Sequence, residues 1–157
     1  MLIHIIYGTN SGGTQTAGEI IAETLRRAKH QVDLINAAQA EADHITQADI
    51  AIIGSCSWEL VKGKERLDGQ LQQHWLDFIK RLRGRTFPKQ RFAVYGLGDS
   101  GYQHFCAAAD HLEKFVAKVE GKQVGPTLRL DNFFFEPSNE AKIERWAREL
   151  EKGLTRD

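Results

Sequence analysis

Short apolar runs alternate with amphipathic stretches along most of the chain, and this alternation predicts the fold class. Apolar runs predict strands at 2–6, 49–53 and 91–95, alternating apolar and polar residues predict one at 31–35, and the segment 123–130 is predicted as a fifth strand. The runs at 49–53 and 91–95 are almost unbroken, which is typical of strands buried on both faces. Apolar residues spaced three and four positions apart predict helices at 13–30, 71–82, 105–119 and 138–150.

The order of these elements predicts a single α/β domain over residues 1–157. Strands that alternate with helices form a parallel sheet with helices on both faces. We expect a loop with at most a short turn at 36–47 and irregular structure at 55–67. Sheets of this kind bind ligands beyond the carboxyl ends of their strands. The loops after the first, third and fourth predicted strands are therefore the candidate site.

Composition and charge exclude several classes of function. A chain of 157 residues is long enough for one buried core. Lys plus Arg equals Asp plus Glu at 21 each, so no net charge favours nucleic acid or a membrane surface. The first apolar run lacks a basic leader and a cleavage site, and no segment has membrane-spanning length, so we expect a cytoplasmic protein. Cys56 and Cys106 are too few for a disulfide framework and lack metal-ligand spacing.

The segment 7–14, Tyr-Gly-Thr-Asn-Ser-Gly-Gly-Thr, joins the first predicted strand to the first predicted helix. The N–H groups at a helix N-terminus carry partial positive charge, and the hydroxyls of this loop are further donors. The loop contains no charged residue, so it could hold a phosphate through backbone and hydroxyl groups alone. The alternative is an ordinary polar turn whose Gly and Asn residues serve backbone geometry.

The chain lacks the residues that three classes of phosphate-handling protein require. A nucleoside triphosphatase needs Lys followed by Ser or Thr after the second glycine, where Thr14 and Gln15 stand. The segment 96–101, Gly-Leu-Gly-Asp-Ser-Gly, matches a dinucleotide-binding pattern but follows the fourth predicted strand instead of the first. A receiver domain needs acidic residues at the ends of the first and third strands, and neither end has one.

The remaining interpretation is a protein that binds a mononucleotide non-covalently. The phosphate would lie in the first loop and a flat ring between the other two, where Trp58 and Tyr102 stand. Aromatic side chains stack favourably on a large apolar ring such as a flavin. The alternative is that both residues are partly exposed surface aromatics.

The three loops resemble those of flavodoxins, and the similarity covers nearly the whole chain. The segment 7–14 is similar to the family's hydroxyl-rich phosphate loop. The segment 54–58, Gly-Ser-Cys-Ser-Trp, is similar to the loop whose Trp covers one flavin face. The segment 96–106, Gly-Leu-Gly-Asp-Ser-Gly-Tyr-Gln-His-Phe-Cys, is similar to the loop whose Tyr stacks on the outer face. The resemblance is to short-chain members and implies a flavodoxin-like, doubly wound sheet of five parallel strands in the order 2-1-3-4-5.

The resemblance also implies FMN and electron transfer. FMN would pass electrons from a flavodoxin reductase or another donor to an acceptor enzyme, with no acid–base catalysis by the protein. We therefore expect no catalytic residue and no metal, and a monomer without nucleic-acid or membrane partners. The residues expected to bind FMN are Thr9, Asn10, Ser11, Gly12, Gly13, Thr14, Ser55, Cys56, Ser57, Trp58, Leu97, Gly98, Asp99, Tyr102, Phe105 and Cys106.

Two alternatives to an electron carrier stay open. A flavin-dependent NAD(P)H or quinone reductase on the same fold would need an open site over the flavin, and Tyr102 on the outer face argues against it. An interaction module with weakened FMN binding is suggested by Asn10 and Gly13, which replace commoner residues of the family loop. Turnover of NAD(P)H by the protein alone would support the enzyme. A colourless protein that does not bind added FMN would support the module.

The chain departs from the family pattern in three ways. Flavodoxins are usually acidic, whereas this chain is neutral, so we expect a less negative potential for the second reduction step. The segment 59–69 is longer than in a short-chain member, and it is either a solvated loop or a flap that docks a partner or shields the flavin. The family often has Gly or Asn after the Trp, where positive φ costs Glu59 roughly 1 kcal/mol, so we expect a weakly stabilised neutral semiquinone.

Overall fold

The computed structural model describes residues 1–9, 12–62, 65–98, 107–131 and 138–155, with the backbone alone for 58–62 and 65–70. Its centre is a parallel sheet with the strand order β2-β1-β3-β5-β6, and β7 also pairs with β5. These strands are β1 (Leu2–Gly8), β2 (Gln31–Asn36), β3 (Ile50–Lys62), β5 (Arg91–Gly98), β6 (Lys122–Gln123) and β7 (Leu128–Asp131). The predicted doubly wound order 2-1-3-4-5 is therefore confirmed.

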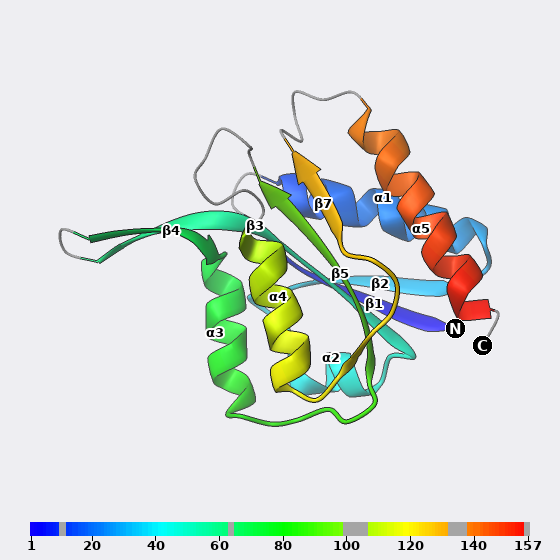
Figure 1. Ribbon diagram of the computed structural model, residues 1–157. Coiled ribbons are helices and arrows are strands. Elements are labelled where there is room, and N and C mark those ends of the chain that lie inside the picture. The colour runs from blue at the N-terminus through cyan, green and yellow to red at the C-terminus, as the bar shows by residue number, and fades with distance from the viewer. Residues whose placement is uncertain (10–11, 63–64, 99–106, 132–137, 156–157) are drawn as a thin grey trace.

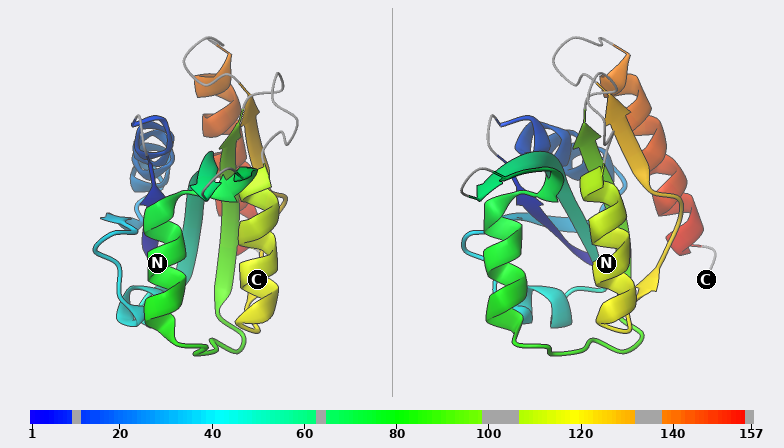
Figure 2. Two further views of the ribbon diagram at one scale, coloured as in Figure 1. Left: turned by 90° about the vertical axis from the view of Figure 1, so that its left-hand side faces the viewer. Right: turned by 60° about the vertical axis from the view of Figure 1, so that its left-hand side comes forward.

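Helices cover both faces of the sheet (Figures 1 and 2). Buried side chains of α1 (Gly13–Arg27) and α5 (Asn139–Thr155) form one core with the sheet. Those of α3 (Gln73–Leu82) and α4 (Ala107–Lys118) form a second core on the opposite face. Among the described helices, none is long and apolar enough to cross a membrane.

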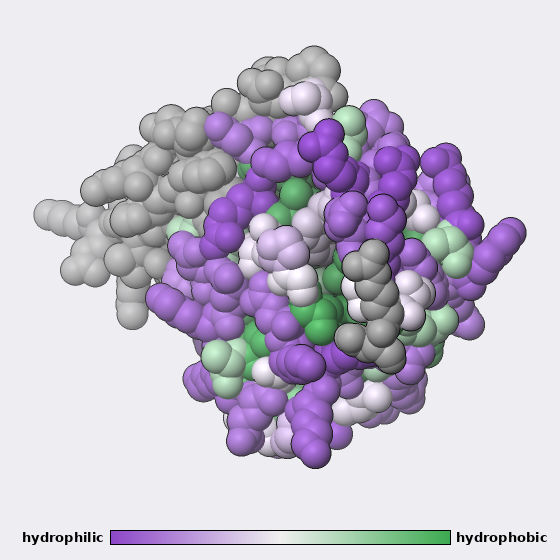
Figure 3. Space-filling view, turned by 45° about the vertical axis from the view of Figure 1, so that its right-hand side comes forward, coloured by the Kyte–Doolittle hydropathy of each residue, from purple (hydrophilic) through white to green (hydrophobic). Residues whose placement is uncertain are grey.

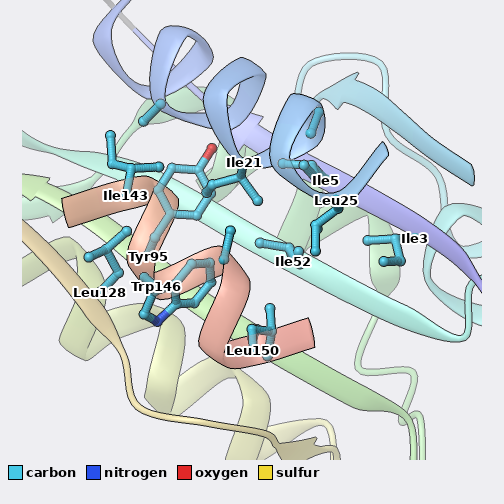
Figure 4. Packing of buried hydrophobic residues seen from close by; sticks show 14 of the residues in the cluster. Ile3, Ile5, Ile21, Leu25, Ile52, Tyr95, Leu128, Ile143, Trp146 and Leu150 are labelled. Carbon is cyan, nitrogen blue, oxygen red and sulfur yellow. The ribbon is translucent and has the colours of Figure 1, made fainter. Parts of the chain in front are cut away.

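The central strands are buried on both faces, as their apolar runs predict. Ile50 and Ile52 pack in the core under α1 and α5, whereas Ala51 and Ile53 pack in the core under α3 and α4. This division follows from the strand geometry, in which successive side chains point to opposite faces. The same alternation places Tyr95 of β5 in the first core, between α1 and α5, as Figure 4 shows.

The prediction of irregular structure at 55–67 is wrong. The strand β3 continues to Lys62 and pairs with the antiparallel strand β4 (Glu65–Leu71), and the hairpin extends beyond the parallel sheet (Figure 1). Its backbone register places Leu60 opposite Leu67 and Lys62 opposite Glu65. Leu71 therefore ends a strand, although the apolar spacing assigned it to a helix.

Two further segments differ from the predictions in detail. The stretch 36–47 contains α2 (Ala42–Thr46), a helix of little more than one turn. The single strand predicted at 123–130 is divided into β6 and β7. Gly125 has φ +71°, and Pro126 has no N–H group to donate to a neighbouring strand, so the ladder is interrupted there.

Candidate functional site

The parallel pairing of three neighbouring strands ends at the carboxyl edge of the sheet, where β1 and β5 end and β3 continues into the hairpin. The register pairs Gly8 of β1 with Ser55 of β3, and Ser55 with Gly96 of β5. One step further, Cys56 pairs with Leu97. The three loops that the sequence singles out therefore begin side by side, at the edge where open α/β sheets bind their ligands.

The first loop is closed by hydrogen bonds of its own residues. The N–H of Gly12 donates to Oγ1 of Thr9 at 2.9 Å, and Gly12 is the N-cap of α1 with φ +87°. The N–H and the hydroxyl of Thr16 both donate to the Gly12 carbonyl at 2.9 Å. The first turn of α1 contains no acidic residue. The helix N-terminus therefore keeps its partial positive charge without a neighbouring carboxylate in that turn.

Thr14 carries an orphaned polar atom in the first turn of α1. Thr14 is fully buried, and its Oγ1 has no hydrogen-bond partner among the described atoms. A buried hydroxyl without a partner costs about 1–3 kcal/mol, so this group is expected to serve a ligand. A phosphate oxygen at the helix N-terminus would accept the hydrogen bond. The residues of this loop therefore fit a phosphate group.

Tyr95 fixes the backbone at the same position. Its hydroxyl donates to the Thr14 carbonyl at 2.9 Å, across the core from β5 to α1 (Figure 4). Burial raises the pKa of the Tyr95 phenol far above its ordinary value, so the group stays protonated and remains a donor. The ring also fills the space beside Gly54, where an added Cβ would lie 2.0 Å from Cζ of Tyr95.

The second loop begins with two serine hydroxyls that bond within the protein. Ser55 Oγ donates to the Cys56 carbonyl at 2.9 Å and accepts from the backbone N–H of Gln72 at 3.2 Å. Ser57 Oγ accepts from the N–H of Ala108, in the first turn of α4, at 3.2 Å. These bonds fix the backbone of β3 where it leaves the parallel sheet. Cys56 is half-buried and packs against the core under α1 and α5.

The third loop is described only at its beginning. Leu97 is buried in the core under α1 and α5, and Gly98 ends β5. The expected FMN-binding residues that lie outside the described residues are Asn10, Ser11, Asp99, Tyr102, Phe105 and Cys106. The side chain of Trp58 is likewise outside the description.

Three side chains that hold this edge together are not among the predicted site residues. Tyr95 holds the Thr14 carbonyl, Trp75 Nε1 donates to the Gly54 carbonyl at 2.7 Å, and Gln72 Nε2 donates to the Thr9 carbonyl at 3.3 Å. Each bond joins residues far apart in the chain, so no local motif indicates it. The sequence indicates these contacts only through two glycines, because Gly8 and Gly54 stand where large neighbours leave no room for a Cβ atom.

A pocket of about 570 Å³ lies away from this edge. It is bounded by the segment 122–126 and the C-terminal half of α5, and β6 pairs with the first residues of β5. Figure 3 shows the face that carries α5, where hydrophobic side chains come to the surface between hydrophilic ones. The described residues contain no group of three or more His, Cys, Asp or Glu residues that could hold a metal ion.

The strand order, together with the polar loop at the N-terminus of α1, defines a doubly wound α/β protein of the mononucleotide-binding class. The family model for flavodoxins matches residues 5–154, and the chain belongs to the flavodoxin family. A flavodoxin of Maridesulfovibrio salexigens is 30% identical over 128 residues, which cover 81% of this chain and 84% of that one.

Solved structures share the fold. Oxidised flavodoxin 2 of Bacillus cereus aligns with a TM-score of 0.84 at 24% identity, covering 97% of this chain and 99% of that chain. A Fusobacterium nucleatum flavodoxin bound to flavin mononucleotide aligns with a TM-score of 0.79 at 20% identity, covering 96% and 97%. At these identities the likeness supports the fold alone.

Proposed function

We propose that this flavodoxin-family protein binds FMN at the carboxyl edge of its sheet and carries electrons between a donor and an acceptor enzyme. The observation that carries the proposal is the buried hydroxyl of Thr14 in the first turn of α1, which has no hydrogen-bond partner among the described residues. FMN supplies the redox chemistry, and the protein binds the cofactor and orients it.

The backbone N–H groups of Gly13 and Thr14, with the Thr14 hydroxyl, would hold the phosphate. The backbone of 55–57 and of Leu97 and Gly98 would line the ring, because these segments flank the first loop at the same edge. The remaining expected contacts are Thr9, Asn10, Ser11, Gly12, Trp58, Asp99, Tyr102, Phe105 and Cys106.

The described side chains around the first two loops favour a carrier over an enzyme. Thr9, Thr14, Ser55, Ser57 and Gln72 are neutral, and the neighbouring imidazole of His74 is engaged by the Gln72 amide, with Nδ1 3.2 Å from Nε2. We place this carrier in the cytoplasm as a monomer, with a flavodoxin reductase or another donor on one side and a redox enzyme on the other. The alternative of an NAD(P)H-dependent reductase predicts turnover by the purified protein without a partner.

The first experiment is to purify the protein, record its visible spectrum and identify any released flavin by chromatography. We expect a yellow protein whose released flavin is FMN, without NAD(P)H turnover. A colourless protein that binds no added FMN would contradict the proposal and support an interaction module.

The second experiment tests the residue that carries the proposal, with Thr14→Val and the matched control Thr24→Val. Thr24 lies in the same helix, and its hydroxyl donates to the Ile20 carbonyl at 2.9 Å. A hydrogen bond to a charged group contributes about 1.5–3 kcal/mol, so Thr14→Val should weaken FMN binding at least about tenfold. The same change should stabilise the apoprotein, because it removes a buried hydroxyl without a partner. If Thr14→Val lowered both quantities, or left FMN affinity unchanged, the phosphate role of this hydroxyl would be wrong.

A further inference from the structure

Gln72 is a buried polar residue at the point where the hairpin returns to the domain. It follows β4 directly, it is the N-cap of α3, and only 2% of its surface is exposed. We propose that Gln72 is a positioning residue for the phosphate: its amide holds the Thr9 carbonyl away from the anion. This inference rests on the proposed FMN function and assigns a role beyond it to a residue outside the three loops.

The polar groups of Gln72 contact three segments of the site. Nε2 donates to the Thr9 carbonyl at 3.3 Å, in the first loop, and lies 3.2 Å from Nδ1 of His74. Oε1 accepts from the N–H of His74 at 2.8 Å, at the start of α3. The backbone N–H donates to Ser55 Oγ at 3.2 Å, in the second loop. The side chain of Gln72 therefore ties the first loop to a helix N-terminus, and its backbone N–H ties the same residue to the base of the hairpin.

The orientation of the amide is fixed by its surroundings. Exchanging its oxygen and nitrogen would set an acceptor against the Thr9 carbonyl and a donor against the His74 N–H. The space is also closed, because a Cβ atom added to Gly8 would lie 2.6 Å from Oε1 of Gln72. The donor is thus held in place by packing against β1 as well as by hydrogen bonds.

Thr9 is restrained through both of its oxygens. Its hydroxyl accepts from the Gly12 N–H within the loop, and its carbonyl accepts from Gln72 outside it. A phosphate site is formed by donors that converge on the anion, and a carbonyl oxygen turned towards the anion would repel it. Without the Gln72 amide, the Thr9 peptide is free to turn its carbonyl towards the phosphate. The effect of Gln72 should therefore fall on the phosphate and not on the flavin ring.

Titration of the apoprotein with FMN and with riboflavin, which lacks the phosphate, separates these two effects. Gln72→Met keeps the length of the side chain and removes the donor. Gln73→Met is the matched control, because Gln73 is exposed and its amide donates to Oδ1 of Asp77 on the surface of α3. We expect Gln72→Met to weaken FMN binding about tenfold or more and to change riboflavin binding less than about twofold. Gln73→Met should change neither.

A second variant, Gln72→Glu, keeps the acceptor for the His74 N–H and so preserves the cap of α3. An ionised carboxylate cannot donate to the Thr9 carbonyl, so FMN binding should be weak near pH 8. Below the pKa of the new carboxyl group the donor returns, and the ratio to wild-type affinity should rise as the pH is lowered towards 5. Because Nδ1 of His74 lies 3.2 Å from Nε2 of Gln72, the series is repeated with His74→Gln in both proteins, and the rise should persist. A ratio that stays constant with pH would contradict a role for the donated hydrogen bond.

Hydrogen exchange of the apoprotein supplies a measurement without any flavin. Gln72→Met should speed exchange of the amide protons of Gly12 to Thr14 relative to Gln73→Met. Equal losses of FMN and riboflavin affinity, or unchanged exchange, would overturn the positioning role. If wild-type protein binds no FMN, the proposed function fails, whereas faster exchange in Gln72→Met would still show that Gln72 restrains the loop.

Discussion

Replacing Trp75 by Phe tests how the middle of the site is held. Trp75 is fully buried, and its indole N–H donates to the Gly54 carbonyl at 2.7 Å, immediately before Ser55. Its ring packs against Phe78 and Phe115, with centroids 5.5 and 5.8 Å away. The Phe ring keeps part of this packing but has no donor. The variant therefore removes one hydrogen bond and leaves a small void beside β3.

The magnitude follows from these two losses. A buried hydrogen bond contributes about 1 kcal/mol to stability, and the void adds about 1–2 kcal/mol for the atoms removed. Trp75→Phe should therefore lower the free energy of unfolding by about 2–3 kcal/mol. In a protein of this size, that change corresponds to a Tm about 5–10 °C lower.

Trp146→Phe is the matched control, because Trp146 also donates its indole N–H to a backbone carbonyl. The acceptor is Pro126 at 2.8 Å, but Trp146 lines the pocket beside α5, where water can replace the lost donor. Loss of the Trp146 hydrogen bond should therefore lower the free energy of unfolding by about 1 kcal/mol. Urea unfolding of the apoproteins, followed by far-ultraviolet circular dichroism, measures both values. Equal costs for the two variants, or a cost below about 1 kcal/mol for Trp75→Phe, would refute the reasoning.

Two further predictions concern close packing and pH. Gly8→Ala should destabilise the protein by about 1–3 kcal/mol, because the new Cβ would lie 2.6 Å from both Gln72 and Trp75. Gly153→Ala in α5, where no atom lies within 4 Å of the Cβ position, should stabilise it by about 0.5–1 kcal/mol, and urea unfolding of the apoproteins measures both changes. Because burial raises the pKa of Tyr95 in the folded state only, wild-type stability should fall above pH 10, where the unfolded phenol ionises. Tyr95→Phe should reduce that decline by about 1.4 kcal/mol per pH unit, and an unchanged slope in urea unfolding between pH 9 and 11.5 would contradict the assignment.

The parts of the fold that the sequence predicts are those whose burial appears in the local pattern. The apolar run at 49–53 indicates a strand buried on both faces, and the structure places it at the centre of the sheet. The local pattern does not predict the hairpin, because the segment 59–69 mixes three acidic and three basic residues with few apolar ones. Its strands are set by pairing with each other, as in Leu60 opposite Leu67. The division of the fifth strand has a visible cause in Gly125 and Pro126, although the whole segment 123–130 is predicted as one strand.

The candidate site divides in the same way. Glycines at the ends of buried strands and hydroxyls at a helix start are local features, so the sequence indicates the loops at 7–14 and 54–58. The groups that hold these loops come from elsewhere in the chain, since Tyr95 bonds to a residue 81 positions away and Gln72 to one 63 positions away. Such bonds depend on the packing of α1, α3 and β5, which no sequence motif records.

The divided strand at the edge of the sheet has a consequence for association between copies of the chain. An uninterrupted edge strand is a template to which another chain can add by backbone hydrogen bonds. Here β6 and β7 are short. Between them, the indole N–H of Trp146 donates to the Pro126 carbonyl, and Nε2 of Gln123 donates to the Gly125 carbonyl and the Thr127 hydroxyl. A second chain therefore meets an edge that is broken in the middle and partly occupied. The irregularity that interrupts the ladder therefore also removes, at this edge of the sheet, a continuous template for an added strand.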